Sequence, residues 1–164
     1  MIPELYIGVT AAIILLLSVQ REHRTMSLLG LVHSAALLMI TLLLLVTPAA
    51  WQTGSPFFLV NHGNLLLVLI TGIIFTCAST YAVGYIEGLV RAGELDRRSL
   101  RIFYMGFALL LLATILAFFA PNVAQFWIFA ELTTVFSAIL VAILAVRENI
   151  DASLKYILVC STSM

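Results

Sequence analysis

The chain has 164 residues, of which 63% are hydrophobic and 10% are charged, and its formal net charge is zero. Soluble globular domains carry about 25% charged residues, so this composition excludes an ordinary soluble domain. The mean hydropathy of +1.15 indicates instead an integral, multi-pass membrane protein, with the lipid bilayer as its first partner. Nucleic acid is not expected as a partner, because nucleic-acid-binding domains are strongly basic.

Five apolar stretches, each close to the roughly 20 residues that cross a bilayer, follow one another along the chain. They cover residues 3–19, 26–47, 65–85, 102–120 and 123–146. The first carries Glu4 in place of a basic region and ends without a small-residue cleavage pattern. We therefore expect it to remain as a span and not to be removed as a signal peptide.

A sixth apolar stretch begins at Leu154 and offers only about 11 residues, half the length of a span. The prediction is thus an all-α, polytopic transmembrane helical bundle of five full spans plus the start of a sixth. Residues 1–164 are expected to form a single transmembrane region that is the N-terminal part of a longer chain.

The basic residues lie in alternate connections and so predict the orientation. Arg21 and Arg24 follow the first span. The third span is followed by Arg91, Arg97, Arg98 and Arg101, and the fifth by Arg147 and Lys155. The positive-inside rule places these three connections in the cytoplasm and the amino terminus outside. In the second of them, Glu87 with Arg91 and Glu94 with Arg98 are spaced i,i+4, which predicts that the neighbouring helices continue beyond the membrane.

Motifs for soluble-type chemistry are missing from the connections. The sequence has no glycine-rich phosphate loop, flavin signature or nucleophile-base arrangement, so no cofactor and no catalytic residue is expected within this chain. Cys77 and Cys160 lie far apart in apolar surroundings and are expected to be neither metal ligands nor disulfide partners.

The fifth span contains an acid, Glu131, in the stretch WIFAELTTVFSAIL, about 12 Å along the helix from Val123. On a helix it shares one narrow face with Ala124, Trp127, Thr134, Ala138, Ala142 and Ala145. Membrane helices pack through small residues, so we expect Glu131 to point at protein or at a cavity and not at lipid.

An ionised acid near the bilayer centre costs on the order of 2.5 to 3.5 kcal/mol, so such residues usually have a partner or a function. Apolar surroundings favour the protonated form of a carboxyl group, and a nearby Lys or Arg favours the ionised form. Glu131 is therefore a candidate proton-relay residue, and a protonated packing contact is the alternative. The first four spans carry no Lys or Arg inside the membrane, so a cationic partner would be Lys155 or would lie beyond Met164.

His33, in LVHSA of the second span, is a further candidate for proton transfer, because imidazole titrates close to physiological pH. A single histidine in a helix is more often a packing residue, so both roles stay open. Thr71, Thr76, Ser79 and Thr80 give the third span a hydroxyl-rich stripe, for which bonds between helices are favoured over a water path.

Several stretches resemble one family of membrane proteins. PNVAQFWIFAELTTVFSAILVAI followed by RENIDASLKYILVCS resembles the fifth span and the start of the sixth in antiporter-like proton-translocating subunits. These occur in respiratory complex I, Mrp-type cation/proton antiporters and energy-converting hydrogenases. STYAVGYIEG is similar to the family's Tyr-Ser-x-Gly-Tyr pattern, and RIFYMGFALL to the start of its fourth span. The ELTT and ASLKY segments are most similar to the F-type subunits of hydrogenase-4.

The resemblance implies a role for two residues. Glu131 matches the family's proton-transferring glutamate on span five, and Lys155 matches a lysine at the beginning of span six whose role is less clear. Family members have about fourteen spans in two inverted repeats of five helices, and a lysine on span seven should pair with the glutamate. This chain lacks that lysine, so the resemblance implies the front end of a longer subunit or half of a split one.

The functional expectation is a proton-translocating subunit of a redox-driven complex such as a membrane-bound hydrogenase or a complex I-like enzyme, in a prokaryotic plasma membrane. Its partners would be other membrane subunits and protons, with sodium as a further coupled ion. Three alternatives stay open: a scaffold or assembly subunit without conduction, a cation/proton antiporter subunit, and an unrelated small transporter or lipid-modifying enzyme.

Overall fold

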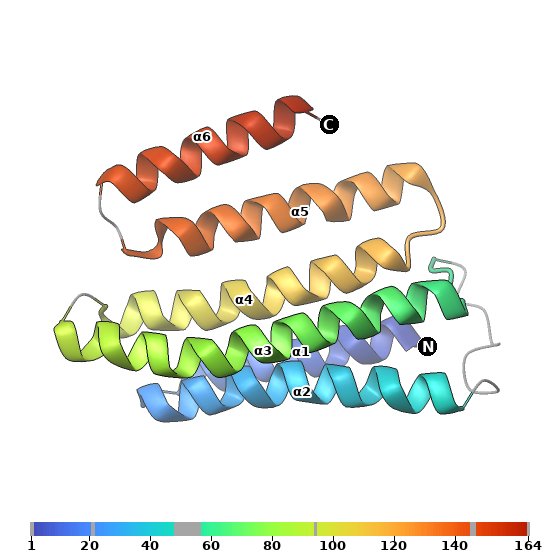
Figure 1. Cartoon of the computed structure of the whole chain (residues 1–164), viewed down its shortest axis with the longest axis horizontal. Coiled ribbons are helices and arrows are strands. Elements are labelled where there is room, and N and C mark those ends of the chain that lie inside the picture. The colour runs from blue at the N-terminus through green and yellow to red at the C-terminus, as the bar shows by residue number, and fades with distance from the viewer. Residues whose placement is uncertain (1, 21, 48–56, 94, 145–146, 164) are drawn as a thin grey trace.

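A computed structural model describes residues 2–20, 22–47, 57–93, 95–144 and 147–163, and in these ranges the chain is almost entirely helical (Figure 1). The helices are α1 (Ile2–Val19), α2 (His23–Val46), α3 (His62–Ala92), α4 (Arg97–Phe118), α5 (Val123–Val141) and α6 (Arg147–Ser163). A short 3₁₀ turn, η2 (Ala142–Leu144), follows α5. Helices α1 to α5 are long and apolar enough to cross a membrane. The predicted all-α, polytopic membrane bundle is confirmed.

Several helix boundaries differ from the predicted spans, and α3 and α6 include charged residues beyond the predicted apolar stretches. Helix α3 has 31 residues and ends only at Gly93, whose φ of 74° is the left-handed conformation that closes many helices. Near that end the predicted pair forms, with Arg91 Nη2 2.7 Å from Glu87 Oε1. The pair predicted for Glu94 and Arg98 lies outside the described residues, since Glu94 is not among them.

Helix α6 begins at Arg147, seven residues before the predicted apolar start at Leu154. Lys155 therefore lies about 12 Å along a helix and not in a connection. Helix α5 ends at Val141 and passes into the 3₁₀ turn, whereas the apolar stretch runs to residue 146.

Helices α1 to α4 form a bundle, α5 packs on α4, and α6 packs on the far side of α5 (Figure 1). Among the described helices, α5 touches only α4 and α6. The connections after α1, α3 and α5 lie at one end of the molecule, and the amino terminus lies at the other (Figure 1). We call the first of these the basic end, because Arg24, Arg91, Arg97, Arg98 and Arg101 lie toward it; that it faces the cytoplasm stays a prediction.

Polar side chains buried between helices hold the four-helix bundle together. They pair as Tyr6 with Thr41 (2.8 Å), Thr10 with His33 (3.0 Å), Ser34 with Ser79 (3.0 Å) and Tyr104 with Ser27 (2.7 Å). Such bonds matter in a bilayer, because lipid tails are as apolar as the side chains and burial alone does not drive helices together. The expected interhelical role of the span-three hydroxyls holds for Ser79, whereas Thr76 and Thr80 bond to carbonyls of their own helix.

Candidate functional site around Glu131

The first turn of α5 is fixed by its cap and by the segment that precedes α3. Asn122 caps the helix by accepting a 2.8 Å hydrogen bond from the Gln125 amide. The Gln125 side chain in turn donates to the Phe57 carbonyl (3.0 Å), and the Phe58 and Phe129 rings stack with centroids 6.3 Å apart. Since Val123 is the first residue of α5, Glu131 lies about 12 Å further along, inside the apolar part of the helix.

The direction in which the Glu131 side chain points follows from a contact that Leu140 makes on the opposite face of α5. A Cβ added at Gly106 of α4 would lie 3.3 Å from Leu140 Cδ2, so Leu140 packs directly against the α4 backbone. Glu131 precedes Leu140 by nine residues, which on an α-helix is a rotation of about 180°. Glu131 therefore faces away from α4, on the side of α5 where α6 lies (Figure 1).

The carboxylate of Glu131 is partly enclosed. Thr134, one turn later, donates to the Glu131 carbonyl (2.7 Å), and its Oγ1 lies 3.3 Å from Oε2. The other oxygen, Oε1, is buried and has no hydrogen-bond partner among the described residues. A buried polar atom without a partner is uncommon in proteins and is a signal of a functional group or of a partner that completes the site.

The predicted small-residue face is covered only along part of its length. Thr134 and Ala138 are buried, at 7% and 1% exposure, and Glu131 is half-buried. Ala124 and Trp127, which were expected on the same packed face, are exposed, Trp127 by 51%. The part of the face nearer the basic end is the part that contacts protein.

Lys155 shares the α5–α6 pair with Glu131 but is not bonded to it. The Ser153 hydroxyl donates to the Ala138 carbonyl (2.9 Å), which fixes the register of the two antiparallel helices. In that register Glu131 lies level with residue 160, so Lys155 lies about 7 Å nearer the basic end. Lys155 is exposed, and the described part of the chain contains no ion pair between it and Glu131.

His33 lies in a different part of the molecule. It is 1% exposed on α2, with Nε2 3.0 Å from Thr10 Oγ1 of α1. Because α2 does not contact α5 in the described structure, His33 and Glu131 are not brought together. The geometry of His33 is that of a satisfied packing residue.

The polar stripe of α2 was not predicted from the sequence, although a signal for it exists. Ser27, Ser34 and Thr41 recur every seven residues, and all three bond to another helix. Seven residues are close to two helical turns, so such a spacing places the side chains on one face. The partners of the stripe could not be identified from one helix alone.

Comparison with known proteins gives one relative that spans most of the chain. The hydrogenase-4 component F homolog of Methylacidiphilum infernorum (isolate V4) is 29% identical over 143 residues, which are 87% of this chain and 29% of the relative. The chain thus spans less than a third of that protein's length. No protein-family model and no solved structure matches the chain.

Proposed function

We propose that this chain is part of an antiporter-like, proton-translocating membrane subunit in a redox-driven complex of the hydrogenase or complex I-like type. The chain would lie in a prokaryotic plasma membrane with its amino terminus outside, and would supply the N-terminal spans of a longer or split subunit. In this proposal Glu131 is the proton-relay carboxylate and the neighbouring membrane subunits complete the path.

The observation that carries the proposal is the environment of Glu131. One carboxylate oxygen is buried without a described partner, within an apolar span and on the α6 side of α5. Intramembrane acids are costly and are functional by default. The likeness to a hydrogenase-4 component F homolog supports the choice of a hydrogenase-type complex.

The relay works through the charge state of Glu131. Apolar surroundings favour the protonated carboxyl, and the approach of a cation favours the carboxylate, so movement of a cation loads or releases the proton. Lys155 lies on the helix that Glu131 faces and is proposed to act on the side nearer the basic end. His33 is proposed to pack α1 against α2, and a relay role for it is the alternative.

The test is Glu131→Gln in the full-length subunit, assembled in its complex and placed in membrane vesicles. Gln keeps the shape and removes the proton-carrying group, so proton translocation should fall by about tenfold or more while assembly persists. Glu87→Gln is the matched control, because that acid pairs with Arg91 near the helix end, where an exposed ion pair contributes little. Unchanged translocation in Glu131→Gln would favour the scaffold function, and dependence on sodium would favour cation/proton exchange.

A further inference from the structure

Two tyrosines of α3, Tyr81 and Tyr85, differ from the tyrosines inside the bundle. Tyr6 and Tyr104 are 0% and 3% exposed, and their hydroxyls bond to side chains of α2. Tyr81 and Tyr85 are 74% and 48% exposed, and their rings stack with centroids 6.1 Å apart. Neither hydroxyl has a hydrogen bond to the residues that the structure describes. A Cβ added at Gly84, between them, would meet nothing within 4 Å, so this face of α3 is open.

The surroundings of a membrane helix decide where such a pair can lie. Hydrocarbon tails offer no hydrogen bonds, so a tyrosine hydroxyl without a partner is costly among them. The boundary between lipid tails and water suits tyrosine, because the apolar ring and the polar tip each find a matching environment there. Helix α3 is long and apolar enough to cross the membrane, so an exposed pair of tyrosines on it indicates one of its two boundaries.

The length of the apolar surface of α3 fits a bilayer whose hydrocarbon ends at Tyr81. On the other side this surface is bounded by Asn61, whose side chain caps the start of the helix. Tyr81 follows Asn61 by 20 residues, which is about 30 Å of helix and matches the thickness of the hydrocarbon core. The large side chains exposed in between, from residue 65 to residue 80, are all aliphatic: Leu66, Leu67, Ile70, Ile73 and Ile74.

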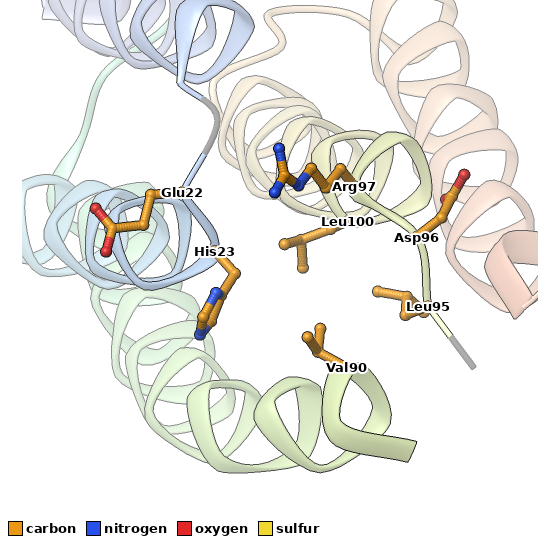
Figure 2. A pocket seen from close by; sticks show the side chains of 7 residues that line it. All are labelled: Glu22, His23, Val90, Leu95, Asp96, Arg97 and Leu100. Atoms are coloured by element: carbon orange, nitrogen blue, oxygen red, sulfur yellow. The ribbon is translucent and has the colours of Figure 1, made fainter. Parts of the chain in front are cut away.

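Beyond Tyr85, α3 enters polar surroundings. Its last turns contain the ion pair of Glu87 and Arg91, which is exposed. Figure 2 shows the cavity of about 420 Å³ that Val90 lines there, with polar and charged side chains from the starts of α2 and α4 around it: Glu22, His23, Asp96 and Arg97. Charged groups are costly in hydrocarbon and lie instead in water or among headgroups. The change from aliphatic to charged surface along α3 thus occurs at the two tyrosines.

We propose that Tyr81 and Tyr85 anchor the protein in the lipid headgroup region on the side of the basic end. Their rings lie against the upper part of the acyl chains, and their hydroxyls donate to lipid ester or phosphate oxygens and to water. The anchor sets the depth of α3 and keeps the turn of Glu87 and Arg91 out of the hydrocarbon. The inference rests on the membrane fold and is independent of the role of Glu131.

The test measures depth by tryptophan fluorescence in the full-length subunit. The protein is reconstituted in vesicles of phosphatidylcholine whose acyl chains are brominated either near the headgroup or near the terminal methyl, because bromine quenches only nearby indole rings. The emission that Tyr81→Trp adds to the unsubstituted protein should be quenched most by bromine near the headgroup. Ile74→Trp is the matched control, since Ile74 is exposed on the same face, about 10 Å deeper along the helix. Its emission should be quenched most by bromine near the chain end.

Two results would overturn the proposal. If Ile74→Trp is quenched but Tyr81→Trp is quenched by neither lipid, protein covers the tyrosines, and this face of α3 is a contact with another subunit. If both variants are quenched most by bromine near the chain end, the membrane boundary does not lie at Tyr81.

The anchoring role has a second readout at Gly88, which is exposed just beyond Tyr85 with no atom within 4 Å of an added Cβ. Gly88→Cys should react with a membrane-impermeant maleimide, as identified by peptide mass. Combining it with Tyr81→Leu and Tyr85→Leu lengthens the apolar stretch of α3, so the helix should sink and the labelling should slow. Equal labelling rates with and without the two leucines would remove the anchoring role from the tyrosines.

Discussion

Gly30 of α2 lies directly beneath the ring of Tyr104 of α4. A Cβ added at Gly30 would be 2.7 Å from Cδ1 and 2.9 Å from Cε1 of that ring, closer than real Cβ contacts. The Tyr104 hydroxyl then donates to Ser27, one turn before Gly30, at 2.7 Å. The absence of a side chain at Gly30 therefore permits the approach that makes this buried hydrogen bond, in the way small residues let membrane helices pack closely.

Gly30→Ala should lower the free energy of unfolding by about 1 to 3 kcal/mol, the usual cost of overpacking a tight contact. The Tyr104 ring is buried and cannot move aside without losing its bond to Ser27. Gly84→Ala on α3 is the control, because a Cβ there meets nothing within 4 Å. Denaturation of the purified protein in a mild detergent measures both, and an equal or greater loss in Gly84→Ala would contradict the role given to Gly30.

The existence of the five spans could be predicted because the length of an apolar stretch is fixed by bilayer thickness. The same criterion fails at helix ends. The apolar stretch of the third span ends near residue 85, whereas α3 continues past the pair of Glu87 and Arg91 to Ala92. The first turns of α6 are charged and so lie outside the apolar stretch that begins at Leu154. Local signals outside the apolar stretch set such ends, as at α3, which closes where Gly93 adopts the left-handed conformation.

The side of α5 that carries Glu131 was predicted to face protein, because small residues mark packed faces of membrane helices, and the described structure buries Thr134 and Ala138 on that face but leaves Trp127 exposed. Which part of that face is covered was not predictable, since it depends on where α6 lies. The bond from Ser153 to the Ala138 carbonyl sets that placement, and nothing in the sequence of α5 alone identifies it. The partner of His33 was hidden for the same reason, because Thr10 belongs to another helix.

Variants of Thr10 and His33 test whether His33 is a packing residue or a proton-transfer residue. Thr10→Val keeps the shape and removes the hydroxyl, leaving His33 Nε2 buried without its partner, so unfolding should become easier by about 1 kcal/mol. Thr10→Ser should restore stability, because it restores the hydroxyl. Detergent denaturation measures the difference.

His33→Gln completes that comparison, because its amide can still bond to Thr10 but does not titrate. If His33 is a packing residue, the variant should translocate protons at the wild-type rate in the assembled complex. A variant that remains stable but loses translocation would assign His33 to the proton path.

We expect the stability of the protein to depend on pH through Asp96, the residue that caps the start of α4. Hydrogen bonds from the Ser99 side chain, and then from its backbone amide, lower the pKa of Asp96 from its ordinary value of 3.8. A carboxyl whose pKa is lower in the folded state stabilises the fold fully above its unfolded pKa. That contribution is lost as the pH falls through the lower, folded value.

Asp96→Asn should therefore flatten the acid side of the stability profile, because asparagine also caps helices but has no charge to lose. Melting temperatures of the two proteins, measured from neutral pH down to below the ordinary pKa of an aspartate, provide the comparison. The structure already contains an amide cap of this type, Asn122 at the start of α5. A wild-type acid transition that persists unchanged in Asp96→Asn would locate the titrating group elsewhere.

Two adjacent threonines on α5 provide a fine test of the Glu131 site. Thr134 Oγ1 lies 3.3 Å from Glu131 Oε2, whereas Thr133 donates only to the Ala130 carbonyl (2.7 Å). Valine matches threonine closely in shape and lacks the hydroxyl. Thr134→Val therefore removes the hydrogen bond that the structure describes between this hydroxyl and the carboxyl group, and Thr133→Val removes a hydroxyl that bonds to the Ala130 carbonyl instead.

If Glu131 carries protons, Thr134→Val should alter the rate of proton translocation by about two- to fivefold, the range of a hydrogen bond worth up to about 1 kcal/mol. Thr133→Val should leave the rate unchanged, and both variants should assemble normally. The rate is measured in vesicles that contain the assembled complex, alongside electron transfer in the same sample. Equal rates in the two variants, with Glu131→Gln also active, would remove Glu131 from the proton path, because neither its charge nor its hydrogen bond would then affect translocation.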